Sequence, residues 1–212
     1  MARALRIRNH VNPLSLHYAV PRARAVAIPA HLGPHPPIDV ELGCADAQFS
    51  FQLAAAHPER LVVALDIRTR IVEHGRERAG EAGLANLVLE YCNASVDLDR
   101  VLPAASVDRV HLLFPDPWFK PRHHKRRVID ADALAAIRSR LRPGGELHVA
   151  SDVYEIALEA MSELEGEGDG VFTNLAGHWR FWRGNPFGAR SLREDMTLRR
   201  GGRVWRLRYG KR

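Results

Sequence analysis

Five short runs of mainly apolar residues recur along the chain, and helical patterns separate most of them. The runs indicate buried strands over 38–43, 61–66, 86–91, 107–114 and 146–151. The periodicity between and after them predicts helices over 46–57, 70–82, 130–141 and 153–164. Strands that alternate with helices imply a mostly parallel sheet covered on both faces, which is the doubly wound α/β fold.

The length of the chain fits one domain over residues 1–212. With 212 residues, 46% of them hydrophobic, the chain can bury one core of ordinary size. We expect a basic N-terminal arm over 1–30 and a basic C-terminal segment over 180–212, which includes a last hairpin or edge strand over 201–209. The residues RPGG at 142–145 provide the breaker that ends the preceding helix.

No stretch of the sequence predicts a membrane span or a secretory signal. No window approaches the roughly 18 consecutive apolar residues of a helical span, and the N-terminus lacks the apolar core of a signal peptide. The two cysteines, Cys44 and Cys92, lie 48 positions apart and match no metal-ligand spacing. We therefore expect a reduced, cytoplasmic protein with no metal and no membrane partner.

Basic residues are concentrated at the two ends of the chain. Residues 1–28 carry five Lys and Arg and no acid, and residues 180–212 carry eleven against two. Residues 128–179 carry three against ten, so the formal net charge of +6 is unevenly distributed. Separate basic clusters favour a polyanionic partner, because displacing counterions from phosphates rewards clustered Arg and Lys.

Acidic or amide side chains follow all five predicted strands. In a doubly wound sheet the ligand crevice lies outside the carboxyl ends of the strands, which meet at one edge. The residues expected at that edge are Glu41, Asp46, Asp66, Asn93, Asp116 and Asp152. Any one of them alone would more often cap a helix than bind a ligand. The complete set on one edge favours a shared pocket.

The turn after the first predicted strand disfavours a dinucleotide. A pyrophosphate site needs G-x-G-x-x-G, whereas the segment ELGCADAQF keeps only Gly43 and places Asp46 where negative charge would meet the diphosphate. S-adenosyl-L-methionine has a cationic sulfonium and no phosphate, so an acidic edge suits it. Asp66, 25 positions after Glu41, is spaced to meet the ribose diol. Asn93 would then lie at the adenine edge, although a plain turn residue explains it nearly as well.

The segment FPDPWFKPRHHKRR at 114–127 combines a constrained carboxylate with aromatic rings and cations. The prolines on both sides of Asp116 restrict its backbone. Trp118 and Phe119 offer surfaces on which a base can stack, unless each belongs to the core, and the cations that follow can contact phosphates. Guanine N7 already has a lone pair in the ring plane, so methyl transfer to it needs alignment more than a general base or a metal. Asp116 could also stabilise the positive charge that develops on the ring.

Taken together, these motifs resemble the bacterial single-subunit tRNA (guanine-N7)-methyltransferases, in particular their cyanobacterial and plant-like branch. The family hallmark F-P-D-P-W-x-K-x-R-H-x-K-R-R is met at every fixed position over 114–127. Further similar segments are RNHVNPLS (8–15), ELGC (41–44), YCNA (91–94), ASDV (150–153) and NPFGARSLRE (185–194). The resemblance implies a class I, Rossmann-like fold with an antiparallel C-terminal strand. It also implies methyl transfer from S-adenosyl-L-methionine to N7 of a guanine in the variable loop of tRNA.

The resemblance further implies roles for particular residues. Asp116 would be catalytic and would also contact the cofactor, together with Glu41, Gly43, Asp66, Asn93 and Ala94. The substrate would be contacted by Lys120, Asp152, Ser191, Arg193 and Glu194, the last of which could hold Lys or Arg side chains or the base itself. The RNA-facing loop would comprise Arg122, His123, His124, Lys125, Arg126 and Arg127. Both histidines would be RNA contacts, because the reaction asks for no general base. The partner would be tRNA, and the protein a monomer or homodimer.

Two alternatives stay open at this point. The family usually keeps a glycine where this chain has Ala47, and alanine adopts a positive φ only at a cost. Together with Ala45, this departure leaves room for a catalytically impaired tRNA-binding protein of the same fold. The fold alone would also allow a nucleotide-dependent oxidoreductase, which the missing glycines disfavour.

Overall fold

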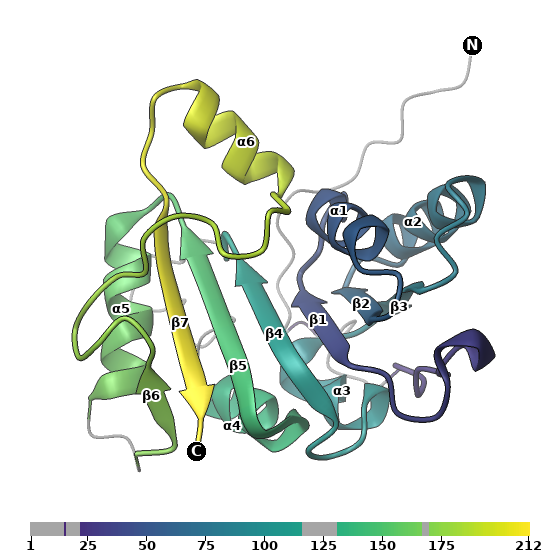
Figure 1. The fold of residues 1–212 in the computed structure, drawn as a ribbon, viewed down its shortest axis with the longest axis horizontal. Helices are drawn as coiled ribbons and strands as arrows, with labels where there is room; N and C mark the ends of the chain where they lie inside the picture. The colour runs from purple at the N-terminus through teal and green to yellow at the C-terminus, as the bar shows by residue number, and fades with distance from the viewer. Residues whose placement is uncertain (1–14, 16–21, 116–130, 167–169) are drawn as a thin grey trace.

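In a computed structural model the chain forms one seven-stranded sheet with helices on both faces (Figure 1). The structure describes residues 15, 22–115, 131–166 and 170–212. The strands are β1 (Ile38–Leu42), β2 (Leu61–Asp66), β3 (Leu87–Tyr91), β4 (Val107–Leu113), β5 (Leu141–Ser151), β6 (Phe172–Asn174) and β7 (Trp205–Lys211). The helices are the short 3-10 helix η1 (Ala30–Leu32), α1 (Gln48–Ala56), α2 (Thr69–Glu81), α3 (Ala94–Val101), α4 (Ala131–Arg140), α5 (Tyr154–Glu165) and α6 (Leu192–Arg199).

The strand order is β3-β2-β1-β4-β5-β7-β6. The first five strands pair in parallel, and β7 is antiparallel to both of its neighbours. The predicted doubly wound sheet with an antiparallel C-terminal strand is therefore confirmed. The prediction of an edge strand at the C-terminus is wrong, because β7 lies between β5 and β6. The edge belongs to β6, whose three residues are too few to give a pattern.

Each face of the sheet has its own apolar core. Strands β1 and β2 are buried at every position. Strand β2 therefore reads as a nearly continuous apolar run, whereas β1 alternates and buries Asp39 and Glu41 as well. One core cluster joins the sheet to α3, α4 and α5, with Leu98, Ile137 and Met161 fully buried. The other joins it to α1 and α2, through residues such as Phe49 and Leu53. Figure 1 shows the first three helices behind the sheet and the other two on the near side.

The near face of β4 and β5 is covered by the C-terminal segment instead of by a crossover helix (Figure 1). Phe187 in that segment packs on His111 of β4 and His148 of β5, each with a ring-centroid distance of 4.8 Å. His111 is fully buried and its Nε2 lies 3.0 Å from Oδ1 of Asp39 on β1. Gln48 of α1 donates a hydrogen bond of 2.8 Å to Asp195 of α6, which ties the segment to the rest of the domain. On this face the sheet surface is a strip of buried polar groups.

The segment RPGG at 142–145 lies near the start of β5, shortly after the end of α4. Helix α4 ends at Arg140 and β5 begins at once with Leu141, which pairs with Val107. The next pairing is Arg109 with Glu146, so residues 142–145 bulge out of the sheet. The prediction that these residues end the helix agrees with the structure. The strand, however, starts before the bulge rather than after it.

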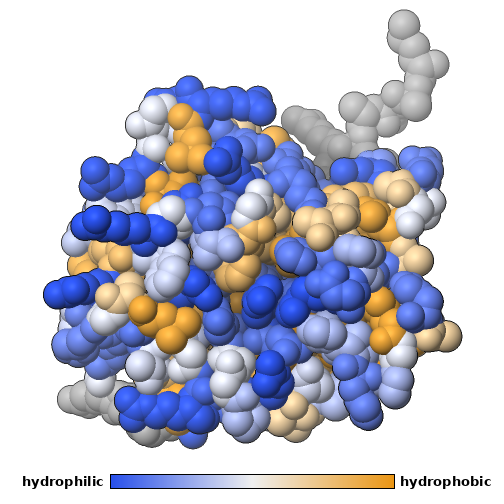
Figure 2. All heavy atoms as spheres, in the orientation of Figure 1, coloured by the Kyte–Doolittle hydropathy of each residue, from blue (hydrophilic) through white to orange (hydrophobic). Residues whose placement is uncertain are grey.

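The near face of the protein is mostly hydrophilic (Figure 2), and both cysteines are buried. Figure 2 shows a mostly hydrophilic near face on which apolar residues form separate patches. Across the described ranges, no helix combines the length and apolarity needed to cross a membrane. Within the same ranges, no group of three or more His, Cys, Asp and Glu side chains is arranged to hold a metal. Cys44 and Cys92 are both buried free thiols.

Candidate active site

The carboxyl ends of β1 to β5 lie along one edge of the sheet, the upper edge in Figure 1. The structure places the following predicted residues at or next to this edge: Glu41, Gly43, Asp46, Asp66, Asn93, Ala94 and Asp152. Asp116, Lys120 and the predicted RNA-facing loop 122–127 lie outside the described residues. Parallel pairing alone is enough to gather these side chains, because every such strand ends at the same edge.

The turn after β1 has a left-handed backbone at three positions. Gly43 has φ 74°, Ala45 has φ 49° and Ala47 has φ 57°. The turn is held by the backbone N–H groups of Gly43 and Cys44, which both donate to the carbonyl of Leu65 on β2. A Cβ built on Gly43 would meet no atom within 4 Å, so this part of the turn faces open space. Strained residues are tolerated where the surroundings hold them, and they cluster at ligand sites.

We expect Ala45→Gly to stabilise the protein by about 0.5–1 kcal/mol, because Ala45 is exposed and a glycine relieves its left-handed strain without losing buried surface. Urea unfolding measures the difference. The matched control is Ala135→Gly, an exposed alanine within α4, where the same change should cost about 1 kcal/mol. Destabilisation of equal size in both variants would show that the turn is not strained at this residue.

Glu41 is a buried carboxyl group at the end of β1. Its side chain accepts a hydrogen bond of 2.5 Å from the hydroxyl of Ser50 on α1. Burial raises the pKa of Glu41 to about 8; the Ser50 hydrogen bond opposes this, and the charges of Asp46 and Asp66 add to it. A cation bound beside these three carboxyl groups would favour their ionised forms. This group of three carboxyl groups therefore fits a positively charged ligand such as a sulfonium.

The raised pKa of Glu41 predicts a pH-dependent loss of stability. The folded protein binds this proton up to a pH of about 8, whereas an unfolded glutamate has a pKa of 4.5, so stability falls as pH rises between those values. We expect Glu41→Gln to gain stability relative to the wild type by about 2–4 kcal/mol between pH 5 and pH 9. Urea unfolding at both pH values measures this. Glu77→Gln, a change on the exposed face of α2, is the control, and a pH-independent difference for Glu41→Gln would contradict the prediction.

Asp66 ends β2 with its carboxylate already bonded. Its oxygens accept hydrogen bonds from the backbone N–H groups of Ala45 and Arg68, at 3.0 and 2.9 Å. The Arg68 guanidinium adds two more bonds, both of 2.8 Å. A ribose diol can reach Asp66 only if the Arg68 side chain moves away. The predicted ribose contact stays a prediction, with Arg68 as a competitor that the sequence did not indicate.

Asn93 begins α3 in the manner of a helix cap. Its side-chain oxygen accepts a hydrogen bond of 3.3 Å from the N–H of Ser95, and its own N–H donates to Asp97. Asp97 also accepts bonds from the backbone of Arg22 and Ala23, so it anchors the N-terminal segment to α3. Capping thus accounts for Asn93 in this structure. Its predicted contact with the adenine, and that of Ala94 with the cofactor, stay predictions.

Helix α6 brings the C-terminal box to the same edge of the sheet. Arg193 forms an ion pair with Asp152, with its Nε and Nη2 atoms 2.8 and 2.7 Å from the carboxylate Oδ2. Thr197 donates a hydrogen bond of 3.2 Å to the same oxygen. Ser191 caps the helix, because its hydroxyl accepts a hydrogen bond from the N–H of Glu194. The four predicted substrate contacts that the structure describes therefore belong to one connected group.

Glu194 points into the protein rather than toward solvent. It is only 2% exposed and forms a buried ion pair with Arg206 of β7. The side-chain amide of Asn185 donates a further hydrogen bond of 3.2 Å to it. Of the two roles left open for Glu194, the structure shows it holding an arginine side chain. This pair fixes α6 above β7.

Comparison with known proteins places the chain in a family. Residues 35–207 match a family model described as "Putative methyltransferase". A relative from Thermosynechococcus vestitus is 32% identical, over 98% of this chain and 96% of the relative. Relatives from Nostoc sp. (34%, covering 97% of this chain and 94% of the relative) and Parasynechococcus marenigrum (36%, covering 96% and 87%) are similar. All three are named tRNA (guanine-N(7)-)-methyltransferase. This chain belongs to that family.

Solved structures agree with the fold of this tRNA (guanine-N7)-methyltransferase family member. The 16S rRNA methyltransferase KamB has a TM-score of 0.57 and 19% identity, with 90% of this chain and 99% of that chain covered. A SAM-dependent methyltransferase from Aquifex aeolicus has a TM-score of 0.55 and 14% identity, with 86% of each chain covered. At these identities the likeness shows the fold alone. The resemblance found in the sequence motifs is thus confirmed at the level of both fold and family.

Several residues of the site could not have been found from motifs. Ser50 and Arg68 contact predicted cofactor residues, and Thr197 and Arg206 contact predicted substrate residues. The only available signal was the alternation of Arg206 and Arg208 in the last strand, which places both cations on one face of the sheet. That face is covered by Glu194 and Phe187, a contact that only tertiary structure reveals.

Proposed function

We propose that this protein transfers the methyl group of S-adenosyl-L-methionine to N7 of a guanine in the variable loop of tRNA. The observation that carries the proposal is the gathering of buried carboxyl groups and the Asp152–Arg193 pair at one edge of the sheet, in a chain of this family. Acidic residues suit a cationic methyl donor, and the basic C-terminal segment suits the phosphates of tRNA.

The chemistry needs little more than alignment. When bound, S-adenosyl-L-methionine supplies an electrophilic methyl group on a cationic sulfur. Asp66 provides negative charge at the end of β2, and a bound cation favours ionisation of Glu41 at the end of β1. The open turn at Gly43 leaves space beside them. Asp152, itself held by Arg193, orients the base, and Asp116 stabilises the positive charge that develops on the ring. No residue has to remove a proton before transfer, because the N7 lone pair is free.

The proposal extends to the partner, the cellular location and the oligomeric state. The partner is tRNA, contacted by the loop at 122–127 and by the C-terminal segment. The protein works in the cytoplasm as a monomer or homodimer, without a metal. Nothing in the described residues favours the impaired alternative, since the turn that lacks two glycines still adopts its left-handed backbone at Ala45 and Ala47.

A methylation assay with a matched substrate tests the proposal. The purified protein is incubated with S-adenosyl-L-methionine and an unmodified tRNA transcript, and the nucleosides are analysed by mass spectrometry. We expect 7-methylguanosine from this transcript and none from a transcript made with 7-deazaguanosine, in which a carbon atom replaces N7. A folded protein that gives no 7-methylguanosine would overturn the proposal. Calorimetric titration with the cofactor then shows whether cofactor binding or transfer is lacking.

A further inference from the structure

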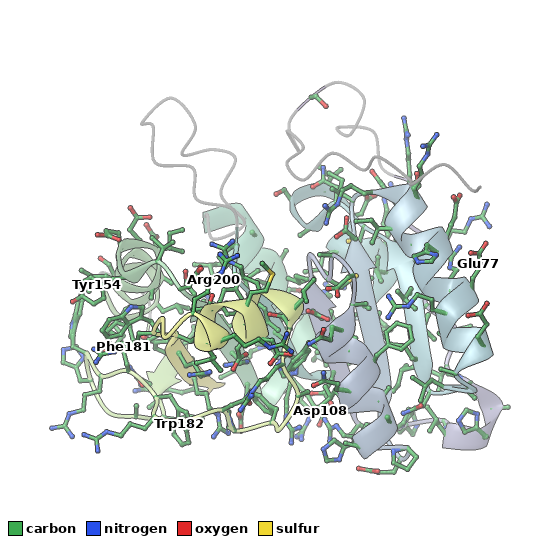
Figure 3. All side chains as sticks on the ribbon, turned by 90° about the horizontal axis from the view of Figure 1, so that it is seen from above. Glu77, Asp108, Tyr154, Phe181, Trp182 and Arg200 are labelled. Atoms are coloured by element: carbon green, nitrogen blue, oxygen red, sulfur yellow. The ribbon has the colours of Figure 1, made fainter. Side chains whose placement is uncertain are left out.

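A partly exposed group of aromatic side chains lies at the edge of the sheet that carries the site, where α5 and β7 begin. Tyr154 is 44% exposed, and its ring centroid lies 4.8 Å from that of Trp205 and 6.0 Å from that of Phe181. The Phe181 and Trp205 centroids are 5.0 Å apart. These three residues are called the aromatic cluster below. Figure 3, which looks down on this edge, shows Tyr154 and Phe181 close together beside α5.

The aromatic cluster is continuous with the predicted substrate contacts. Trp205 pairs with Ser151, the last residue of β5, and Asp152 follows directly after that strand. Tyr154 is only two residues further on, at the first position of α5. Asp152 is held in place by Arg193 and Thr197 of α6. The cluster and this carboxylate therefore lie at the same end of the sheet, on residues that are close in the chain.

Arginines that form no ion pair lie close in the chain to residues of the aromatic cluster. The Arg203 guanidinium carbon lies 4.9 Å from the centroid of the Trp205 ring. In the described residues 180–203, five exposed arginines form no ion pair: Arg180, Arg183, Arg199, Arg200 and Arg203. The other arginines between 190 and 208 each lie within 4 Å of a carboxylate. The uncompensated charge is therefore concentrated on the segments that flank the cluster, and Figure 3 shows Arg200 on the cluster's side of α6.

The glutamates of α5 make the surface on one side of the aromatic cluster acidic. Glu155, Glu159 and Glu163 recur every four residues, so they share one stripe of the helix. Tyr154 and Leu158 lie one position earlier and therefore on the neighbouring stripe. A phosphate chain would be repelled by the acidic stripe and attracted by the arginines. This asymmetry favours a polyanion that passes over β7 and α6 rather than along α5.

We propose that the aromatic cluster and these five arginines form a second tRNA contact surface, on which an unpaired nucleotide next to the target guanine stacks. The inference rests on the proposed function and adds a site that the sequence motifs did not indicate. Unpaired bases in RNA are bound by aromatic rings and arginine planes, with cations on the flanking phosphates. A nucleic acid brings both groups at once, bases for the aromatic rings and phosphates for the exposed arginines.

Substitution of Tyr154 tests the stacking. We expect Tyr154→Ala to raise the KM for tRNA about ten-fold, with kcat changed less than two-fold, since one stacked base is lost. Tyr154→Phe keeps the ring and should behave as the wild type. Trp179→Ala removes another exposed aromatic ring, one that lies outside the cluster beside His178, and should leave the KM unchanged. Thermal unfolding and cofactor titration of each variant confirm that the fold and the cofactor site are intact.

Substitution of Arg203 tests the electrostatic part of the same surface. Arg203→Ala should weaken tRNA binding and reduce the slope of log Kd against log salt by about one, as expected for one lost phosphate contact. Arg100→Ala, at the exposed end of α3, is the matched control and should leave the slope unchanged. If folded Tyr154→Ala and Arg203→Ala keep wild-type KM and salt slope while the wild type forms 7-methylguanosine, the second surface is rejected. If the wild type itself forms none, the proposed function fails instead.

Discussion

Asp116→Ala is expected to lower the kcat for tRNA methylation by at least about 10²–10³-fold and to leave tRNA binding nearly unchanged. The residue lies outside the described ranges, so the prediction rests on its sequence and on the backbone that leads to it. Phe114 follows β4 with φ 50°, and its N–H donates to the carbonyl of Ala150 at 2.7 Å. A bulky residue in this conformation directly before a proline shows that the fold holds the start of the segment firmly. The carboxylate that follows should therefore be well placed to act on the base and the developing charge.

Single-turnover methylation and filter binding separate the two effects of Asp116→Ala. Glu77→Gln on α2 removes one negative charge from an exposed position and serves as the control. Arg126→Ala should behave oppositely, with weaker tRNA binding, a salt slope reduced by about one and little change in the rate once tRNA is bound. Equal losses in both assays for both variants would contradict this division of roles.

Glu194→Ala is expected to lower the free energy of unfolding by about 3–5 kcal/mol, because it leaves the Arg206 guanidinium buried without a counter-charge. Chemical denaturation measures the loss. If Glu194 acted mainly on the substrate, the stability would hardly change and the KM for tRNA would rise instead. The two readouts therefore decide between a residue that contacts the base and one that positions α6 and its Arg193.

Two further variants sharpen the test of this ion pair. Asp195→Asn changes the next residue of α6, whose carboxylate is partly exposed and lies 3.7 Å from Arg190, so it should cost at most about 1 kcal/mol. The double variant Glu194→Leu with Arg206→Met removes both charges and should recover most of the lost stability. A double variant as unstable as Glu194→Ala would show that the charges themselves are not the cause.

Much of the fold was readable from periodicity. The five parallel strands and the helices α1, α2, α4 and α5 lie within a few residues of their predicted bounds, because buried runs and amphipathic spacing are strong local signals. Four elements were missed: α3 and α6, which have eight residues each, and η1 and β6, which have three each. Elements of this size are stabilised by what they pack against, so their own sequence holds little information about them.

Only part of the site was predicted, because local sequence signals show where strands end but not which side chains meet there. The carboxyl groups at the strand ends were found, because parallel strands necessarily deliver them to one edge. The partners of those groups were not found: Arg68 on Asp66, Ser50 on Glu41, and Arg206 on Glu194. The first pair is two residues apart, but whether a side chain folds back depends on the space around it. The last two join different elements across the fold.

The sequence by itself determined the order of strands and helices, the acidic edge and, through one motif of fourteen residues, the family. Only the tertiary structure decided how the C-terminal segment is used. It lies over the polar face of β4 and β5, buries Glu194 against Arg206, brings Arg193 to Asp152, and leaves the aromatic cluster partly exposed at the same edge. Local periodicity reports which way a residue faces within its own element. It does not report which distant element arrives to cover that face, because that choice depends on complementary charge and shape between segments far apart in the chain.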